Sequence, residues 1–323
     1  MTTGPEITPA RPRILVICAA GLERFVPALG AMGAIRAHHE GSEIILLAAR
    51  AASAFAATAP YFDDVWIDET DGRLSIQPLL ALRRRLRAQT FDRVYDLDGT
   101  PASRRIFWLL YGRRGLSKPT LPWSGDIAGT ALAYTDPRRA AMHTVDRWAA
   151  QLKVAGIGAV LRPDLSWVAR QVTSFAVPFR MADPFVLLAP SPGPGESWPA
   201  SRWGELAADL HAGRQVPVVI GANVPGEIVR TIGEFCPNAI DLSGRATVNE
   251  MVFLAWAANA AVGADNGVMH LTAAAGCRTL VLYDGASDPA LVGQRGNRVS
   301  ILRRPRLAEI PVGEVLIALA AGK

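Results

Sequence analysis

Short apolar runs alternate with segments of helical periodicity through the first half of the chain. Unbroken apolar runs, rich in β-branched residues, predict buried strands at residues 13–18, 43–48, 64–67 and 91–97. Apolar residues recur at helical spacing over residues 25–38, 51–59, 79–89 and 144–154. Strands that alternate with helices indicate an α/β fold with a doubly wound, mostly parallel sheet.

A second alternation of the same kind begins at residue 185. Strands are predicted at residues 185–189, 216–220, 239–242, 260–262 and 279–283. Helices are predicted at residues 198–212, 226–235, 248–258 and 312–321. Prolines interrupt regular structure just before this second alternation, so the boundary between two domains is expected there.

The expected organisation is two Rossmann-like domains that face each other across a cleft. Residues 1–13 are expected to form a disordered tail, and residues 171–184 a linker. The N-terminal domain spans residues 14–170 and the C-terminal domain residues 185–323. The last helix, 312–321, can pack back on the N-terminal domain.

Composition narrows the class of protein. The chain has 323 residues, of which half are hydrophobic, and its formal net charge is +5. That balance suits two packed cores and an anionic substrate or membrane surface, without requiring nucleic acid. The three cysteines contain no CxxC pair, so neither a disulfide framework nor a zinc site is expected. The first residues lack the apolar core of a signal peptide and no apolar run is long enough to span a membrane, so a cytoplasmic protein is expected.

The segment GADNGVMHLTAAAG, at residues 263–276, carries the strongest candidate chemistry. Asp265 and Asn266 can cap a helix that begins at Gly267, because their side-chain oxygens accept hydrogen bonds from first-turn amides. A helix amino end binds anions, phosphate above all, and His270 falls on the same first turn. An ordinary capped helix is the alternative interpretation of this segment.

Four segments in the second half resemble the glycosyltransferase family 9 enzymes, the ADP-heptose:lipopolysaccharide heptosyltransferases. Residues 263–276 resemble that family's GxDSGxMHLAAAxG segment, and residues 241–250 resemble its DLTGxTSLxE segment. WPASRW, at residues 198–203, is similar to WPxERF, and VVIG, at residues 218–221 and followed by Glu227, is similar to VVLxGxxxE. The first half matches more weakly, at residues 14–36 and 91–99.

This resemblance implies a GT-B architecture, with the donor held mainly by the C-terminal domain and the acceptor by the N-terminal one. It implies an inverting, metal-independent transfer of heptose from ADP-heptose to a lipopolysaccharide-core or other cell-envelope glycan. The nucleotide sugar is a co-substrate, and no cofactor or metal is expected. The donor-binding candidates that the resemblance selects are Ser191, Glu227, Asp265, Asn266, Gly267, Val268, Met269 and His270.

Two departures from the family pattern concern catalysis and charge. Where the family has Gly-Asp, whose Asp is the expected general base, this chain has Glu23-Arg24. Glu23 is therefore the candidate base, and Gly21 can re-aim its loop. Where the family has a phosphate-neutralising lysine, this chain has Glu196, so Arg24 or Arg202 is a candidate for the missing positive charge.

Two functions therefore stay open. The first is a heptosyltransferase-like enzyme with a glycolipid acceptor at the inner membrane surface, without nucleic acid and without a transmembrane segment. The second is a catalytically reduced family member that binds nucleotide or glycan without turnover. An epimerase-like enzyme shares the architecture but has no motif support. The arginines of residues 83–87 form either a solvated helix face or a contact with the anionic inner leaflet, which would make the protein peripheral there.

Overall fold

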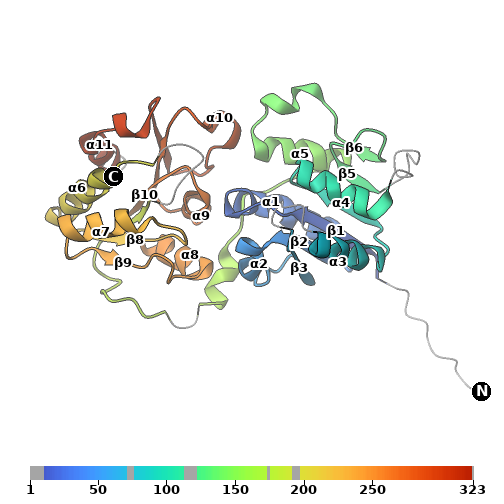
Figure 1. The fold of residues 1–323 in the computed structure, drawn as a ribbon, viewed down its shortest axis with the longest axis horizontal. Coiled ribbons are helices and arrows are strands. Elements are labelled where there is room, and N and C mark those ends of the chain that lie inside the picture. The colour runs from blue at the N-terminus through green and yellow to red at the C-terminus, as the bar shows by residue number, and fades with distance from the viewer. Residues whose placement is uncertain (1–10, 71–75, 113–121, 173–174, 191–196, 322–323) are drawn as a thin grey trace, which may run out of the picture. The chain divides into compact units, whose positions relative to one another are not determined.

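The computed structural model describes residues 11–70, 76–112, 122–172, 175–190 and 197–321 (Figure 1). The chain divides into two compact units. The first unit contains residues 1–20, 31–139 and 147–161, and the second contains residues 21–30, 140–146 and 162–323. Ser191 and Glu196, and most of the expected N-terminal tail, lie outside the described residues.

The first unit is built on a six-stranded sheet with the order β3-β2-β1-β4-β5-β6, in which all pairs are parallel. Its strands are β1 (Arg13–Cys18), β2 (Glu43–Ala49), β3 (Asp64–Asp68), β4 (Arg93–Asp96), β5 (Trp123–Gly125) and β6 (Leu132–Ala133). The helices of this half of the chain are α1 (Leu22–His38), α2 (Arg50–Ala56), α3 (Ile76–Arg87), α4 (Pro101–Tyr111) and α5 (Thr144–Val154). The first part of α1, residues 22–30, and the start of α5, residues 144–146, belong to the second unit.

The apolar runs fold as central strands because both faces of a parallel sheet are covered. Ile14 to Cys18 are all buried in β1, the middle of this sheet. One core of the first unit brings together strand and helix residues, with Leu15 and Ile17 packed beside Leu86 of α3 and Phe107 of α4. The pattern of the sequence therefore identifies the strands that lie at the centre of the unit.

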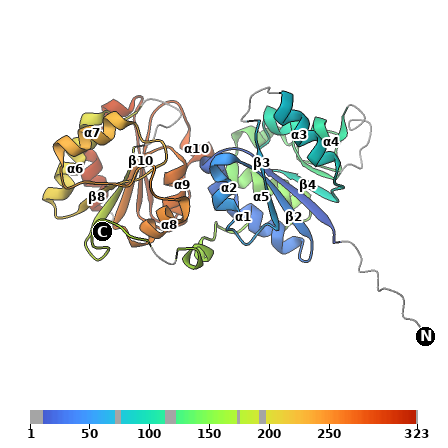
Figure 2. The same ribbon diagram turned by 60° about the horizontal axis from the view of Figure 1, so that its bottom comes forward.

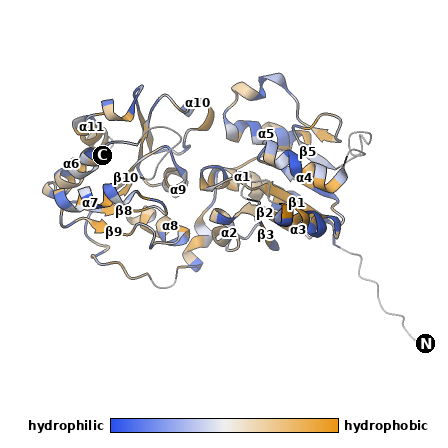
Figure 3. Cartoon of the chain, in the orientation of Figure 1, coloured by the Kyte–Doolittle hydropathy of each residue, from blue (hydrophilic) through white to orange (hydrophobic). Residues whose placement is uncertain are grey.

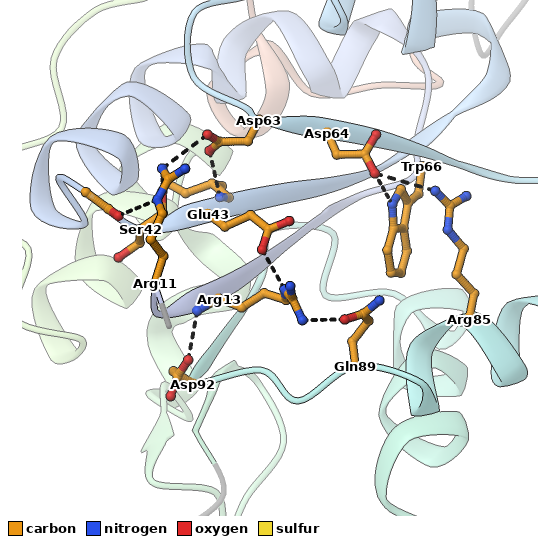
Figure 4. A network of polar contacts seen from close by, with 12 residues as sticks. Arg11, Arg13, Ser42, Glu43, Asp63, Asp64, Trp66, Arg85, Gln89 and Asp92 are labelled. Atoms are coloured by element: carbon orange, nitrogen blue, oxygen red, sulfur yellow. Dashed lines mark hydrogen bonds and ion pairs between the residues drawn. The ribbon is translucent and has the colours of Figure 1, made fainter. Parts of the chain in front are cut away.

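A polar network closes the amino ends of β1, β2 and β3 (Figure 4). Arg13 donates from Nε to Glu43 at 2.7 Å, and its amide donates to Asp92 at 2.7 Å. Asp63 accepts from Arg11 and Arg36. Burial opposes ionisation of Asp63, but the Ile44 amide and the two guanidinium groups hold the pKa of its carboxyl below the usual value. Arg11 and Arg13 are thus held on the sheet.

The second unit repeats the topology of the first, with the sheet order β12-β11-β10-β7-β8-β9 and only parallel pairs. Its strands are β7 (Phe185–Ala189), β8 (Val216–Val219), β9 (Ile240–Asp241), β10 (Ala260–Ala264), β11 (Thr279–Tyr283) and β12 (Val299–Arg303). Its helices are α6 (Ala200–Ala212), α7 (Gly226–Phe235), α8 (Val248–Ala257), α9 (Gly267–Ala274), α10 (Pro289–Val292) and α11 (Val312–Ala321). Figure 2 shows α6 beside α7, and the two helices pack together.

Residues 140–146 are fastened to the segment that includes α10. His143 Nε2 lies 2.9 Å from the Gly293 carbonyl oxygen, and Thr144 donates to the Leu291 carbonyl at 3.2 Å. The Asp146 carboxylate accepts hydrogen bonds from both terminal nitrogens of Arg295, at 2.7 and 2.5 Å. These bonds explain why a short segment from the first half of the chain belongs to the second unit.

The expected fold class is confirmed, since each unit is a parallel Rossmann-like sheet with helices. Among the described α-helices and β-strands, the sequence did not predict α4, β5, β6, α10 and β12. The described contacts of α11 are with α6 and β11, and Val312 and Val315 join the core of the second unit. Packing of this helix on the N-terminal domain stays a prediction. Among the described helices, none has the length and apolar character that crossing a membrane requires.

Candidate functional site

Each sheet reverses its strand order at one point, between β1 and β4 in the first unit and between β7 and β10 in the second. Ligands of open α/β sheets bind outside the carboxyl ends of the strands at such a point. The segment at residues 263–276 follows β10, so its helix α9 begins at the switch point of the second unit. The sequence-predicted donor motif therefore occupies the place where this topology holds ligands.

Asn266 both caps α9 and ties it to the neighbouring strand. Its Oδ1 accepts hydrogen bonds from the amides of Val268 at 3.0 Å and Met269 at 3.2 Å. Its Nδ2 donates to the Ala189 carbonyl at the end of β7, at 3.2 Å. The predicted cap is present, but these two amides, which the sequence suggested as diphosphate ligands, are bonded to the cap itself.

Asp265 does not cap the helix and instead turns toward β11. Its Oδ1 accepts from Gln294 Nε2 at 2.8 Å and lies 3.0 Å from the Tyr283 hydroxyl, and its Oδ2 accepts from Ser287 at 2.9 Å. Burial raises the pKa of the Tyr283 hydroxyl, and the Asp265 charge adds to this, so the hydroxyl stays protonated. The carboxylate is held in one direction directly before α9.

Sequence reasoning missed Tyr283, Ser287 and Gln294. The signal that finds Tyr283 is the register of β10 and β11, in which Ala264 pairs with Leu282. That register sets Asp265 beside Tyr283 at the ends of adjacent strands. The order of strands in a sheet cannot be read from the sequence, so the pairing of β10 with β11 is known only from the structure.

His270 is buried on α9, with 7% of its surface exposed. Burial lowers the pKa of its imidazole to about 4, the charge of Asp265 opposes this, and His143 adds to it. The ring is therefore neutral near pH 7. A hydrogen bond from this ring to a ligand fits the environment, and a positive charge on it does not.

Gly267 is the point where α9 meets the start of α1 within the second unit. A Cβ on Gly267 would lie 2.6 Å from the Leu22 Cβ and 2.9 Å from the Glu23 amide nitrogen. Because glycine has no side chain, another group can approach its backbone closely. In the structure that partner is the Leu22–Glu23 backbone, so the candidate base and the donor motif adjoin.

The carboxylate of Glu23 folds back on its own loop. Its Oε1 accepts the Gly21 amide at 3.1 Å, and the Gly21 carbonyl accepts the amides of Arg24 and Phe25, which begin α1. A Cβ on Gly21 would lie 2.5 Å from Glu23 Oε2. Only glycine at position 21 leaves the carboxylate this place, so Gly21 sets the direction of Glu23.

The switch point of the first unit carries two aspartates that organise a turn. Asp96 Oδ1 accepts the amides of Asp98 and Gly99, each at 3.0 Å, and its Oδ2 accepts the Ser103 hydroxyl at 2.8 Å. Burial raises the pKa of Asp96 to about 7. Asp98 Oδ2 accepts the Ala19 amide at 2.7 Å, which joins the end of β4 to the end of β1. Within the described ranges, no group of three or more His, Cys, Asp or Glu side chains is placed to hold a metal ion.

The remaining predicted residues lie apart from these contacts. Glu227 is exposed on the first turn of α7, after β8. Arg202, on the first turn of α6, pairs with Glu205 at 3.2 Å, so part of its charge is already compensated. Arg24 is half-buried on the first turn of α1.

Comparison with known proteins agrees with this architecture. The family described as Glycosyltransferase family 9 (heptosyltransferase) matches residues 79–312. A family 9 glycosyl transferase from Veillonella parvula is 17% identical, with 97% of each chain covered and a TM-score of 0.76. E. coli ADP-heptose lps heptosyltransferase II is 20% identical over 96% of this chain and 98% of that chain, with a TM-score of 0.71. E. coli heptosyltransferase WaaC with ADP is 16% identical over 96% of this chain and 100% of that chain, with a TM-score of 0.74. No curated protein matches the sequence.

The two Rossmann-like units, with a capped helix at the switch point of the second, define a glycosyltransferase fold of the GT-B type. The family match covers more than half of the chain. The chain belongs to glycosyltransferase family 9, the heptosyltransferase family.

Proposed function

We propose that the chain transfers a sugar, heptose by its family, from a nucleotide-diphosphate donor such as ADP-heptose to a cell-envelope glycan such as the lipopolysaccharide core. The acceptor is a glycolipid at the cytoplasmic side of the inner membrane, and the transfer is inverting and needs no metal ion. The observation that carries this proposal is the close contact of Gly267 with the Leu22–Glu23 backbone. It sets the candidate base next to the helix of the donor motif.

In the proposed reaction Glu23 takes the proton of an acceptor hydroxyl while that oxygen forms a bond to the anomeric carbon. The bond from that carbon to the diphosphate breaks in the same displacement, which inverts the configuration. The amino end of α9 stabilises the charge that develops on the leaving diphosphate. Neutral His270 contributes a hydrogen bond. By their places in the family motifs, Ser191 donates to a phosphate oxygen and Glu227 accepts from the ribose hydroxyls.

Calorimetric titration with ADP, GDP and UDP in the absence of metal tests the donor site. Turnover with ADP-heptose and a lipopolysaccharide-core acceptor then tests the base. Glu23→Gln is expected to lower kcat by about 100-fold or more and to leave ADP affinity unchanged. Glu40→Gln, an exposed glutamate in the loop after α1, is the matched control and changes neither. Absence of binding for every nucleotide would overturn the transferase proposal.

A second candidate is a family member that binds nucleotide or glycan without turnover. Hydrogen bonds within the protein occupy both the candidate base and the amino end of α9, which favours this candidate. Glu23 accepts a hydrogen bond from the Gly21 amide, and the Val268 and Met269 amides donate to Asn266. This candidate predicts ADP binding with no transfer by the unmodified protein. Glu23→Gln then alters stability alone.

A further inference from the structure

The outer faces of α3 and α4 in the first unit combine exposed apolar side chains with arginines. The α3–α4 surface consists of Ile76, Leu80, Arg83, Arg84 and Arg87 of α3 with Arg105 and Trp108 of α4. We infer that this surface docks the protein on an anionic lipid bilayer. The inference extends the proposed function, which needs access to a glycolipid, but its test requires neither donor nor acceptor.

Helical spacing gathers the residues of α3 into one stripe. Ile76, Leu80 and Arg83 are separated by four and three positions, and Arg87 follows four positions later, so all four project from the same side of the helix. About a quarter to a third of a turn around the helix from this stripe, Leu82 and Leu86 are buried in the core of the first unit. The stripe therefore faces outward because the other face of α3 is fixed by packing.

α4 continues this surface. Its buried side carries Ile106 and Phe107, while Trp108 points outward. Arg87 Nε donates to the Leu109 carbonyl at 2.8 Å, which joins the end of α3 to the end of α4. The two helices lie side by side in both ribbon views, and Figure 3 shows hydrophilic and hydrophobic stretches along each of them.

The positive charge of the surface is not compensated by its own helices. Neither α3 nor α4 contains an aspartate or a glutamate. Among the described residues, Arg85 pairs with Asp64 and Arg104 with Asp126, whereas Arg83, Arg84 and Arg105 form no ion pair. Such a cluster attracts an anionic partner.

The apolar members select the kind of partner. Ile76 is 72% exposed, Leu80 45% and Trp108 42%. A nucleic acid would satisfy the arginines through its phosphates but would leave the aliphatic side chains in water. A bilayer accepts both, since arginines meet the headgroups, tryptophan prefers the interface, and aliphatic chains enter the acyl boundary. Charge and apolar exposure on one face therefore match an anionic membrane.

Co-sedimentation with lipid vesicles tests the inference with the full-length protein. Vesicles of phosphatidylcholine with phosphatidylglycerol are compared with vesicles of phosphatidylcholine alone. The protein is expected to bind the anionic vesicles and to be released by about 0.5 M salt, which screens charges beyond a few ångströms. Equal binding to both kinds of vesicle, or to neither, would overturn the inference.

Two sets of variants assign the binding to the α3–α4 surface. Arg83→Gln, Arg84→Gln and Arg105→Gln together are expected to weaken the partition coefficient by about 100-fold, at about fivefold for each arginine. Arg50→Gln, Arg230→Gln and Arg306→Gln remove the same charge from exposed positions elsewhere and are expected to change it a few-fold at most. Equal losses in the two triple variants would show that net charge, and not this surface, drives binding.

A single pair of substitutions tests the apolar part. Ile76→Ser removes a side chain that is 72% exposed, and Ile317→Ser on α11 removes one that is 69% exposed. Only Ile76→Ser is expected to weaken vesicle binding, and both variants keep the denaturation midpoint. Binding of a single-stranded RNA that depends on the same arginines, without vesicle binding, would assign the surface to nucleic acid and overturn the inference. Loss of vesicle binding with intact sugar transfer counts against this inference alone, and the reverse result counts against the proposed function alone.

Discussion

The Tyr283 hydroxyl lies 3.0 Å from Asp265 Oδ1 and 2.8 Å from Gln294 Oε1, so a single hydroxyl proton serves two acceptors. Parallel pairing of β10 with β11 brings the two residues together at adjacent strand ends. With Asp265 held in this way, Asn266 is the residue that caps α9. That Asn266 and not Asp265 caps the helix thus depends on Tyr283, which comes from the neighbouring strand.

Replacement of Tyr283 by phenylalanine measures this relationship. The variant leaves Asp265 with Gln294 and Ser287 but removes one buried donor, so the free energy of unfolding is expected to fall by about 1–2 kcal/mol. Urea denaturation gives the value. Tyr111→Phe is the control, because the Tyr111 hydroxyl forms no hydrogen bond within the described ranges. Equal losses in the two variants would contradict a special role for the Asp265 contact.

Gly21→Ala tests the direction of Glu23. The added Cβ would lie 2.5 Å from Glu23 Oε2, so the carboxylate must leave its place. If Glu23 is the base, kcat is expected to fall by about tenfold or more, because a general base acts only within hydrogen-bond reach of the proton. Nucleotide affinity, measured by calorimetry, is expected to stay the same.

The control for Gly21→Ala is Gly226→Ala, at the start of α7. A Cβ on Gly226 has no heavy atom within 4 Å. This variant is expected to keep full activity. An unchanged kcat in Gly21→Ala would show that the position of the Glu23 carboxylate does not matter for transfer.

Burial of His270 makes stability depend on pH. Its pKa is about 4 in the folded state, below the usual 6.5, so the unfolded chain takes up the proton first as the pH falls. Stability that is present above pH 6.5 is expected to decline down to about pH 4, by on the order of 3 kcal/mol. His270→Gln removes this part of the slope, while His39, whose pKa burial also lowers to about 4, keeps its own. If urea denaturation gave the unmodified protein and His270→Gln the same dependence of stability on pH, this role of His270 would be refuted.

The raised pKa of Asp96 predicts the opposite dependence of stability on pH. Burial raises its pKa to about 7 in the folded state, so the folded chain keeps a proton that the unfolded chain loses from about pH 4 upward. Asp96→Asn keeps an oxygen for the Asp98 and Gly99 amides and has no charge to bury. As the pH rises from 4 to 8, the free energy of unfolding of this variant is expected to increase by about 2–4 kcal/mol relative to that of the unmodified protein. Thermal denaturation across this range checks the sign, and a constant difference would contradict it.

The sequence predicts the sheets well because buried parallel strands are short unbroken apolar runs. The strands β1, β7 and β11 begin and end where the pattern places them. β5 is missed since three residues, Trp123–Gly125, carry no periodicity. α4 is missed because Arg104 and Arg105 break the apolar pattern of a helix whose buried side is only Ser103, Ile106 and Phe107.

The candidate site was predictable where one segment contains all the chemistry. Asn266 as a cap and Gly267 as a point of close approach follow from local rules. The partners of these residues come from elsewhere in the chain: Ala189 from β7, Leu22 from α1 and Tyr283 from β11. The neutral state of His270 likewise depends on burial by the folded unit. Long-range contacts of this kind cannot be deduced from a single sequence.

The division of the chain into units has a consequence for protein synthesis. All strands of the first sheet lie in residues 13–133, and those of the second in residues 185–303. A ribosome therefore releases one complete sheet before the other begins, which favours folding of one half at a time. Residues 21–30 and 140–146 are exceptions, because they pack with the second unit. The nascent first half thus holds a finished sheet together with two segments, one of them the Glu23 loop, that acquire their packing partners only when the last third of the chain has been made.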